Sequence, residues 1–205
     1  MKKLFLLLIL AAATTVAIAQ RHDDEIQTIF SRNRNNGAYG AFSLGYSQIN
    51  GRDALVAGAR GAFLFDRCLA LGLGGYGFVN DVDNHQVHNG LPLNLSLAGG
   101  YGGIVIEPIL APKLPVHLSF PILLGAGGVA LIENSGWWRD DYYEWGHDVF
   151  WVVEPMVELE FNLTRFLRLA AYTSYRFTSR IDLENIDSNV LREPQIGLTV
   201  KLGKF

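Results

Sequence analysis

A strict two-residue alternation of side-chain character is the feature that most constrains how this chain can fold. Along residues 149–162 every odd-numbered position is apolar: Val149, Trp151, Val153, Pro155, Val157, Leu159 and Phe161. The even-numbered positions include three glutamates and an asparagine. Successive side chains of a β-strand point to opposite faces, so the pattern predicts one strand with an apolar and a polar face. This strand is longer than most strands of soluble proteins.

The same alternation recurs along the chain and predicts eight strands. They lie at about residues 38–48, 54–65, 68–79, 91–106, 116–131, 149–162, 167–178 and 195–202. Pro121 and Pro155 fall inside two of these strands, where a proline removes a ladder donor. We therefore expect a β-bulge at each of these prolines.

The connections between the strands alternate in length. Residues 66–67, 109–115 and 163–165 are short connections, whereas 80–90, 132–148 and 179–192 are long and polar. Short turns at one end and long loops at the other are typical of outer-membrane barrels. We predict an all-β fold, a closed antiparallel eight-stranded transmembrane up-and-down β-barrel over residues 37–205. The strands of a secreted β-sandwich or of a soluble lipocalin-like barrel also alternate between apolar and polar residues. The length of the strands and the placement of the long loops at one end favour the membrane barrel.

Lipid surroundings give this pattern a physical reason. Backbone groups in hydrocarbon need partners within the protein, so the sheet must close. Side chains outside the barrel must then be apolar, and those inside a narrow lumen can be polar or small. The 22 glycines of the chain allow such a small sheet to coil. Two aromatic girdles are expected, with Tyr46, Tyr76, Phe78, Trp151, Tyr175 and Phe177 towards the loops and Phe63, Phe65, Phe161 and Phe166 towards the turns.

The N-terminal residues have the composition of an export signal. Lys2 and Lys3 precede an apolar run over residues 4–13, and Ala17 and Ala19 form a small-x-small cleavage site. We expect residues 1–19 to be a cleaved signal peptide, because the apolar run is short for a membrane anchor. Residues 20–36 form a polar leader with the spacing of a short amphipathic helix. The net charge of −3 predicts no nucleic-acid binding, and the single cysteine excludes an internal disulfide.

The signal, the eight amphipathic strands and the terminal Phe205 resemble small outer-membrane barrels of the OmpA/OmpX type. The resemblance is architectural and transfers no activity. It implies an integral location in the cell outer membrane, contact with outer-membrane lipids and lipopolysaccharide, and reading of the last strand by the barrel-assembly machinery. Phe205 shares its parity with Lys201 rather than with Leu202. Either a bulge near Gly203 restores the register, or Phe205 points inward.

Charged residues on the predicted inner face are the main candidate site. The set comprises Glu154, Glu158, Glu160, Arg168, Arg176 and Arg60. If the turn between the predicted strands 149–162 and 167–178 centres on Thr164, Glu160 lies across from Arg168, and Glu154 lies diagonal to Arg176. Buried charges must be paired, so we favour a network that fills the lumen. The alternative is a gated ion path through the barrel.

Two long loops offer candidate binding residues. The third loop carries Trp137, Trp138, Tyr142, Tyr143 and Trp145, which suit a surface ligand such as a glycan or, alternatively, a cap on the barrel mouth. The second loop holds Asp81, Asp83, His85 and His88. Their spacing matches no EF-hand or zinc site, so a solvated loop is favoured, and neither a metal nor a cofactor is expected.

The sequence His117-Leu118-Ser119 resembles the His-x-Ser pair of lipid A deacylase barrels. It lies near the turn end of its strand, whereas Glu133 lies at the far end, and members of a triad must share hydrogen bonds. We therefore predict no catalytic residue. The favoured function is a non-enzymatic outer-membrane barrel with a structural or surface-binding role. A small gated pore and a lipid A-modifying enzyme are the alternatives.

Overall fold

The computed structural model describes residues 36–49, 51–82, 87–88, 91–92, 95–133, 144–183 and 186–205. For its residues between 81 and 96 and between 131 and 145, only the backbone is described. In the part of the chain so described, no helix is long and apolar enough to cross a membrane. The expected signal peptide at 1–19, and the expected leader apart from Asn36, lie outside the described residues.

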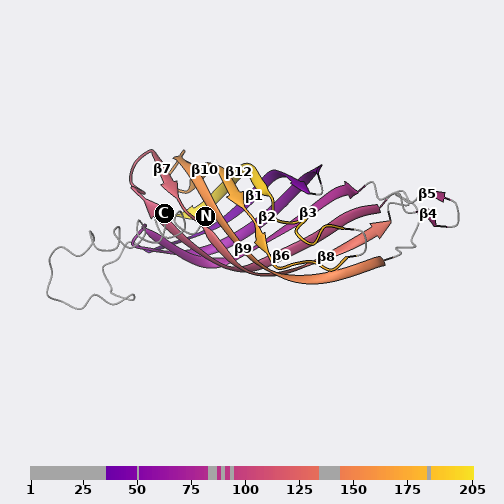
Figure 1. Ribbon diagram of the computed structural model, residues 1–205. Coiled ribbons are helices and arrows are strands. Elements are labelled where there is room, and N and C mark those ends of the chain that lie inside the picture. The colour runs from indigo at the N-terminus through magenta and orange to yellow at the C-terminus, as the bar shows by residue number, and fades with distance from the viewer. Residues whose placement is uncertain are drawn as a thin grey trace, which may run out of the picture. The chain divides into compact units, whose positions relative to one another are not determined.

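The described residues form antiparallel β-strands that lie side by side in a strongly curved sheet (Figure 1). Their bounds are β1 Gly37–Ile49, β2 Arg52–Phe65, β3 Leu69–Val82, β4 Val87–His88, β5 Leu91–Pro92, β6 Leu95–Leu110, β7 Val116–Ser119, β8 Ile122–Glu133, β9 Glu144–Asn162, β10 Leu167–Tyr175, β11 Phe177–Thr178 and β12 Pro194–Lys204. The strands β4 and β5 pair only with each other. The expected strand at 91–106 is therefore divided and begins its main part at Leu95.

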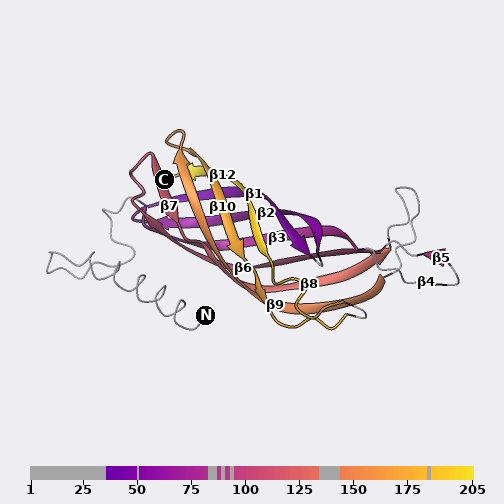
Figure 2. The same ribbon diagram turned by 45° about the horizontal axis from the view of Figure 1, so that its top comes forward.

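The remaining ten segments form one sheet that closes into a ring. Closure comes from β12, which pairs with β1 from Lys204 opposite Ala38 to Gln195 opposite Ser47 (Figure 2). The segments β7 and β8 follow each other along β9 as one interrupted strand, and so do β10 and β11. The ring therefore has eight strands, and the predicted closed antiparallel fold is confirmed.

The two prolines inside strands do not shift the register. Ser119 lies opposite Glu158 and Ile122 opposite Pro155, which is the same register on both sides of Pro121. The bulges expected at Pro121 and Pro155 were wrong, because neighbouring main-chain bonds hold the ladder: the Met156 N–H donates to the Pro121 carbonyl at 2.7 Å. The shift in the β8–β9 ladder lies instead at Leu131.

The turn between β9 and β10 differs from the expected one. Arg168 lies opposite Asn162, not opposite Glu160. The turn is centred on Arg165 rather than on Thr164, because the Thr164 hydroxyl accepts the N–H groups of Phe166 and Leu167 at 3.2 and 3.0 Å. The same register places Phe177 opposite Val153, and so sets Arg176 directly beside Glu154 rather than diagonal to it.

The ring is apolar outside. Thirty large apolar side chains of the described residues are exposed, and the exposed fraction reaches 69% for Phe63, 75% for Val149 and 66% for Leu198. A protein dissolved in water rarely exposes so much contiguous apolar surface. The outer face of this sheet therefore requires an apolar environment.

Two apolar clusters fill the ends of the interior. The turn-end cluster consists of Tyr39, Ala41, Ala62, Leu64, Ala70 and Ile109, with Phe205 packed against it. The loop-end cluster includes Tyr76, Phe78, Tyr101, Leu123 and Phe150. Tyr76 and Phe78 are 4% exposed and face inward, so their expected place in an outer aromatic girdle was wrong. Aromatic residues near strand ends do not always face outward, because the interior of the closed sheet also holds large aromatic side chains.

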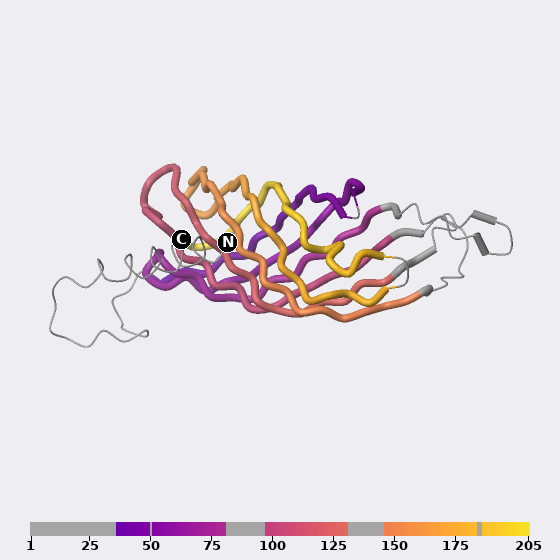
Figure 3. The backbone as a smooth tube through the Cα atoms, in the orientation of Figure 1, coloured from indigo at the N-terminus to yellow at the C-terminus, as the bar shows by residue number. Residues whose placement is uncertain are grey.

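A segment between β11 and β12 folds back over the loop end of the ring. This cap segment, residues 179–183 and 186–193, turns back in the orange-to-yellow part of the trace in Figure 3. Its buried apolar residues, Ile181, Leu183, Val190 and Leu191, join the loop-end cluster. The Ile181 N–H donates to the Ser188 carbonyl at 3.0 Å, which closes the segment on itself. A segment expected to be a polar loop is thus partly a plug.

Gly58 makes room for the packed rings of the loop-end cluster. A Cβ at Gly58 would overlap the ring of Tyr76, which is buried and stacks on Tyr101 at a centroid distance of 5.5 Å. We expect Gly58→Ala to lower the free energy of unfolding by about 1–3 kcal/mol, as overpacking does. Urea unfolding in detergent, followed by tryptophan fluorescence, measures this change.

The matched control for this prediction is Gly61→Ala in the same strand. A Cβ at Gly61 has no neighbour closer than the Tyr39 carbonyl oxygen at 4.0 Å. Equal unfolding midpoints for the two variants would show that the interior of the ring is not tightly packed at Tyr76.

Candidate functional site

The interior between the two apolar clusters holds buried charge. All six of the predicted charged residues lie there, each no more than 4% exposed: Arg60, Glu154, Glu158, Glu160, Arg168 and Arg176. Glu107 and Lys201 join them and are fully buried. The described part of the interior therefore contains four carboxylates and four cationic side chains. Such pairing is what charges removed from water require.

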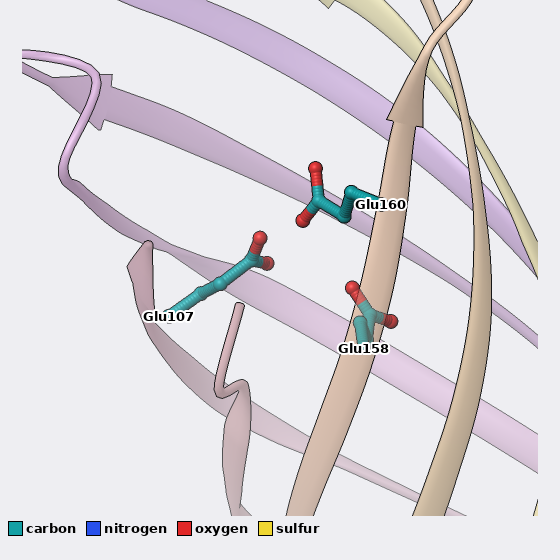
Figure 4. A group of neighbouring side chains, drawn as sticks. All are labelled: Glu107, Glu158 and Glu160. Carbon is teal, nitrogen blue, oxygen red and sulfur yellow. The ribbon is translucent and has the colours of Figure 1, made fainter. Parts of the chain in front are cut away.

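Lys201 is the centre of the larger group of charges. Its Nζ lies 2.6 Å from Glu107, 2.7 Å from Glu158 and 2.6 Å from Glu160. Figure 4 shows the three carboxylates turned towards one another, Glu107 from β6 and the other two from β9. Lys201 itself comes from β12. One ammonium group thus joins three strands that are distant in sequence.

Two arginines complete the neutralisation of these carboxylates. The Arg60 Nη2 group donates to both oxygens of Glu158, at 2.7 and 2.6 Å. Arg168 Nη1 lies 3.2 Å from Glu160, reaching it across the offset register of β9 and β10. Such short charge-assisted bonds are the strong kind. The group therefore carries three negative and three positive charges.

Hydroxyl groups and a histidine ring contact further carboxylate oxygens of this group. His117 Nε2 lies 3.1 Å from Glu160, and the Ser119 hydroxyl donates to Glu158 at 3.2 Å. The Tyr39 hydroxyl donates to Glu107. His117 and Ser119 therefore bind two different carboxylates inside the ring. This arrangement gives both residues a place in the network, and neither faces the outer surface of the ring.

A second, smaller charge pair lies closer to the cap segment. Arg176 Nε is 3.8 Å from Glu154 Oε2, and the Arg176 Nη2 group donates to Gln195 at 3.0 Å. Glu154 also accepts the hydroxyls of Ser174 and Tyr101 at 2.6 and 2.5 Å. The Arg176 guanidinium lies 4.8 Å from the centroid of the Tyr101 ring. Cation–π contact adds to the ionic attraction in such a dry site.

The three glutamates around Lys201 also have the composition of a cation site. One oxygen from each of Glu107, Glu158 and Glu160 lies within 4.8 Å of the others, and hard divalent cations take oxygen donors of this kind. The Lys201 ammonium already lies within hydrogen-bond distance of all three. A divalent ion would add two charges to a group that is already neutral, so the arrangement favours lysine as the resident cation.

The network also contains four residues that the sequence analysis did not include in it: Glu107, Lys201, His117 and Ser119. Lys201 has inward parity in its strand, which is a signal available from the sequence. Glu107 shares its parity with Leu95 and Leu97, which the alternation assigns to the apolar face, so its inward position was not signalled. The convergence of Glu107 and Lys201 is not available from the sequence either, since β6, β9 and β12 meet only through the closed ring.

The other predicted residues lie mainly outside what the structure describes. Trp137, Trp138, Tyr142 and Tyr143 are outside the described residues, and Trp145 has only its backbone described, within β9. For the second loop, Asp83 and His85 are likewise outside, and Asp81 and His88 have only their backbones described. The loop-binding residues therefore remain predictions.

Phe205 follows the second of the two sequence-based alternatives. Its ring stacks on Tyr39 with centroids 5.8 Å apart, and the Arg168 guanidinium lies 3.8 Å above it. Lys204 stays opposite Ala38 and Gly203 opposite Tyr39, so no bulge intervenes near Gly203. The terminal aromatic residue therefore points inward and covers the ionic network at the turn end.

Asp148 holds the cap segment against β9, on the loop side of Trp151. Its carboxylate accepts the N–H groups of Asp182 and Val149, each at 2.7 Å. These two backbone donors, that of Asp182 first, lower the pKa of Asp148 below its ordinary value. The cap segment is therefore fastened by an ionised carboxylate.

Comparison with known proteins supports the architecture alone. No protein-family model matches the sequence, and no curated protein matches it. Among solved structures, the Neisserial surface protein A (NspA) aligns over 83% of this chain and 97% of its own, with 9% identity and a TM-score of 0.52. The chain has the fold of a small outer-membrane β-barrel protein.

Two further solved structures align with lower scores. Ail, the attachment invasion locus protein of Yersinia pestis, in complex with the heparin analogue sucrose octasulfate, aligns with 10% identity over 83% of this chain and 99% of its own, at a TM-score of 0.47. The outer membrane protease OmpT from Escherichia coli aligns with 9% identity over 88% of this chain and 98% of its own, at a TM-score of 0.37.

Lys201→Met is the sharpest test of the network. The substitution leaves Glu107, Glu158 and Glu160 without their shared ammonium, and breaking a buried ion pair in this way costs about 3–5 kcal/mol. We expect a corresponding fall in the free energy of unfolding, measured by urea titration in detergent. Adding Glu107→Gln to the same chain removes one surplus negative charge and is expected to restore part of the loss.

The control for this prediction is Leu202→Met, which changes the adjacent, outward-facing residue of β12 with little change in volume. It is expected to leave the unfolding free energy nearly unchanged. If Lys201→Met is as mild as Leu202→Met, the network does not stabilise the ring.

The lowered pKa of Asp148 predicts that acid releases the cap segment. The contribution of this carboxylate is fully present above the ordinary aspartate pKa of 3.8 and is lost as the pH falls towards the lowered value. Hydrogen exchange at the Asp182 amide is expected to accelerate, after correction for intrinsic rates, below about pH 4. Asp148→Asn should show fast exchange at neutral pH, and a wild-type exchange rate in that variant would contradict the fastening role.

Proposed function

We propose that this chain is an integral outer-membrane protein with a closed interior, and that its role is structural or surface-binding, with neither transport nor catalysis. The observation that carries the proposal is the filled interior. A neutral network of buried charges lies in the ring together with two apolar clusters. Eight strands leave room for side chains but not for a wide aqueous channel.

The exposed apolar belt supports the membrane location. On β9 the outward residues from Trp151 to Phe161 form a stretch of eleven positions, which matches the length of a tilted transmembrane strand. Tyr175 and Phe177 lie with Trp151 at the loop end of the belt, and Phe63 and Phe166 lie with Phe161 at the turn end. Such rings suit the two interfaces of a bilayer.

The cap segment supports a closed state of the ring at the loop end. It buries Ile181, Leu183, Val190 and Leu191 against the interior residues of the loop-end cluster. The pore alternative would need a path past this plug and past two groups of paired charges. The enzyme alternative would need a reachable nucleophile, whereas Ser119 is buried and bonded to Glu158.

The partners of the proposed protein follow from its location and its loops. Outer-membrane lipids and lipopolysaccharide are the expected surroundings of the belt, and residues 197–205 are proposed as the signal for the barrel-assembly machinery. The aromatic residues of the segment 137–145 are proposed to bind a surface ligand. Replacing these aromatics together by serine should abolish that binding on a glycan array while leaving the ring folded.

Membrane insertion is tested by extraction and by gel migration. The protein is expected to remain in the membrane pellet after carbonate washing, and to migrate faster on a denaturing gel when it is not boiled. Recovery of the folded protein in a detergent-free soluble extract would refute the proposal.

Electrical recording separates the closed barrel from the pore. We expect no discrete openings from the wild-type protein in planar bilayers, because the buried charges block the ring independently of the cap segment. A variant in which a short glycine-rich turn replaces residues 179–193 should also remain silent. Openings in that variant alone would assign the block to the cap segment, and openings in the wild type would overturn the closed-barrel proposal.

A further inference from the structure

The turn end of the ring carries an uneven charge. Each of the three short turns contributes one cation, Arg67 between β2 and β3, Lys113 between β6 and β7 and Arg165 between β9 and β10, and Lys204 ends β12 beside them. We call these four residues the cationic rim. Three of them are exposed, and Arg67 is half-exposed. None of the four forms an ion pair with a residue that the structure describes.

At the loop end of the ring, acidic side chains outnumber basic ones. Among the residues with described side chains, the loop end carries five acids, Asp53, Asp148, Asp182, Asp187 and Glu193, against the arginines Arg52, Arg180 and Arg192. At the turn end the acidic side chain among those described is that of Asp66. The described side chains therefore give the two ends of the ring net charges of opposite sign.

Each cation of the rim lies next to an exposed apolar side chain. Leu114 follows Lys113, Phe166 follows Arg165, and Leu202 lies two residues before Lys204; they are 55%, 61% and 55% exposed. Leu69, 37% exposed, lies two residues after Arg67. A long cationic side chain beside an apolar one is the arrangement that places charge at headgroup depth above hydrocarbon. The rim thus lies where the apolar belt ends.

Local backbone structure holds the rim residues at the edge of the belt. Asp66 and Arg67 have φ of 52° and 61°, and the Cys68 N–H donates to the Phe65 carbonyl at 3.1 Å, which makes a tight hairpin turn. The Leu114 N–H donates to the Ala111 carbonyl at 3.0 Å, which closes the turn that carries Lys113. Short, hydrogen-bonded turns keep these charges close to the strand ends.

We infer that the cationic rim binds the anionic headgroups of phospholipids in the leaflet next to the short turns. The inference rests on the proposed membrane location. At headgroup depth these four cations, which have no ion-pair partner among the described residues, meet lipid phosphates. In phosphatidylcholine the choline ammonium balances the phosphate, whereas the headgroup of phosphatidylglycerol is anionic, so the rim distinguishes the two lipids. Each such cation near an anionic surface contributes about fivefold to the local binding constant.

The single cysteine of the chain allows a direct test. Cys68 is exposed and lies next to Arg67 in the first short turn, so a donor fluorophore attached there reports on the rim alone. The labelled full-length protein is reconstituted in phosphatidylcholine vesicles that contain a few mole per cent of an acceptor lipid labelled on its acyl chain, which leaves the headgroup unchanged. Energy transfer to labelled phosphatidylglycerol is compared with transfer to labelled phosphatidylcholine at the same mole fraction.

The expected result is a severalfold local enrichment of phosphatidylglycerol at Cys68, decreasing as salt screens the exposed charges. Lys113→Gln with Arg165→Gln should bring the ratio of the two transfers close to one. The matched control, Arg52→Gln with Arg180→Gln at the loop end, should leave the wild-type ratio unchanged.

The outcomes separate this inference from the proposed function. A protein that fails to insert into vesicles, shown by unprotected strands on proteolysis, contradicts the membrane proposal itself. An inserted protein with equal transfer to both lipids, or with a ratio that the rim substitutions do not change, overturns the rim inference and leaves the membrane proposal standing. If the loop-end control variant loses as much of the preference for phosphatidylglycerol as the rim variant does, the rim inference is also overturned.

Discussion

A strand in an apolar environment must form all its main-chain hydrogen bonds within the protein. The closure of the sheet, its apolar outer face and its narrow interior all depend on this constraint. The pairing of β12 with β1 meets it by joining the two ends of the sheet. Once the ring is closed, each strand has an outer and an inner face. The outer face carries the apolar side chains that a soluble protein would bury, and the inner face encloses a narrow space.

The narrow inner space sets the second constraint, which is charge neutrality. Four carboxylates and four cations are removed from water together, and each must be paired at short distance. Lys201 has the central position because its compact ammonium group fits between three carboxylates, where a planar guanidinium would not donate equally in three directions. The arginines lie at the periphery, where Arg60 engages both oxygens of a single carboxylate. The charged groups of the interior thus lie between two apolar clusters of buried side chains.

Much of this architecture was readable from the sequence. Period-two alternation predicted the eight strands of the ring, and parity predicted that Arg60, Glu158 and the other four charges face inward. The register across a turn was less accessible, since one hydroxyl, that of Thr164, widened the β9–β10 turn and moved Arg168 from Glu160 to Asn162. The bulges expected at Pro121 and Pro155 failed because the neighbouring main-chain bonds keep the ladder in register.

The amino-acid sequence by itself determined that side chains alternate between the two faces, because side-chain direction along a strand is a local property that repeats every two residues. It indicated the outer face wherever one face was clearly apolar, but not at Tyr76 and Phe78, which face inward. Only the tertiary structure decided which inward residues meet. Glu107, Glu158 and Lys201 are far apart in the chain and come together through ring closure. The cap segment likewise takes its place through contacts of its buried apolar residues with distant strands. Such contacts depend on strand stagger and on the space left by packed rings, and neither is encoded in any short stretch of sequence.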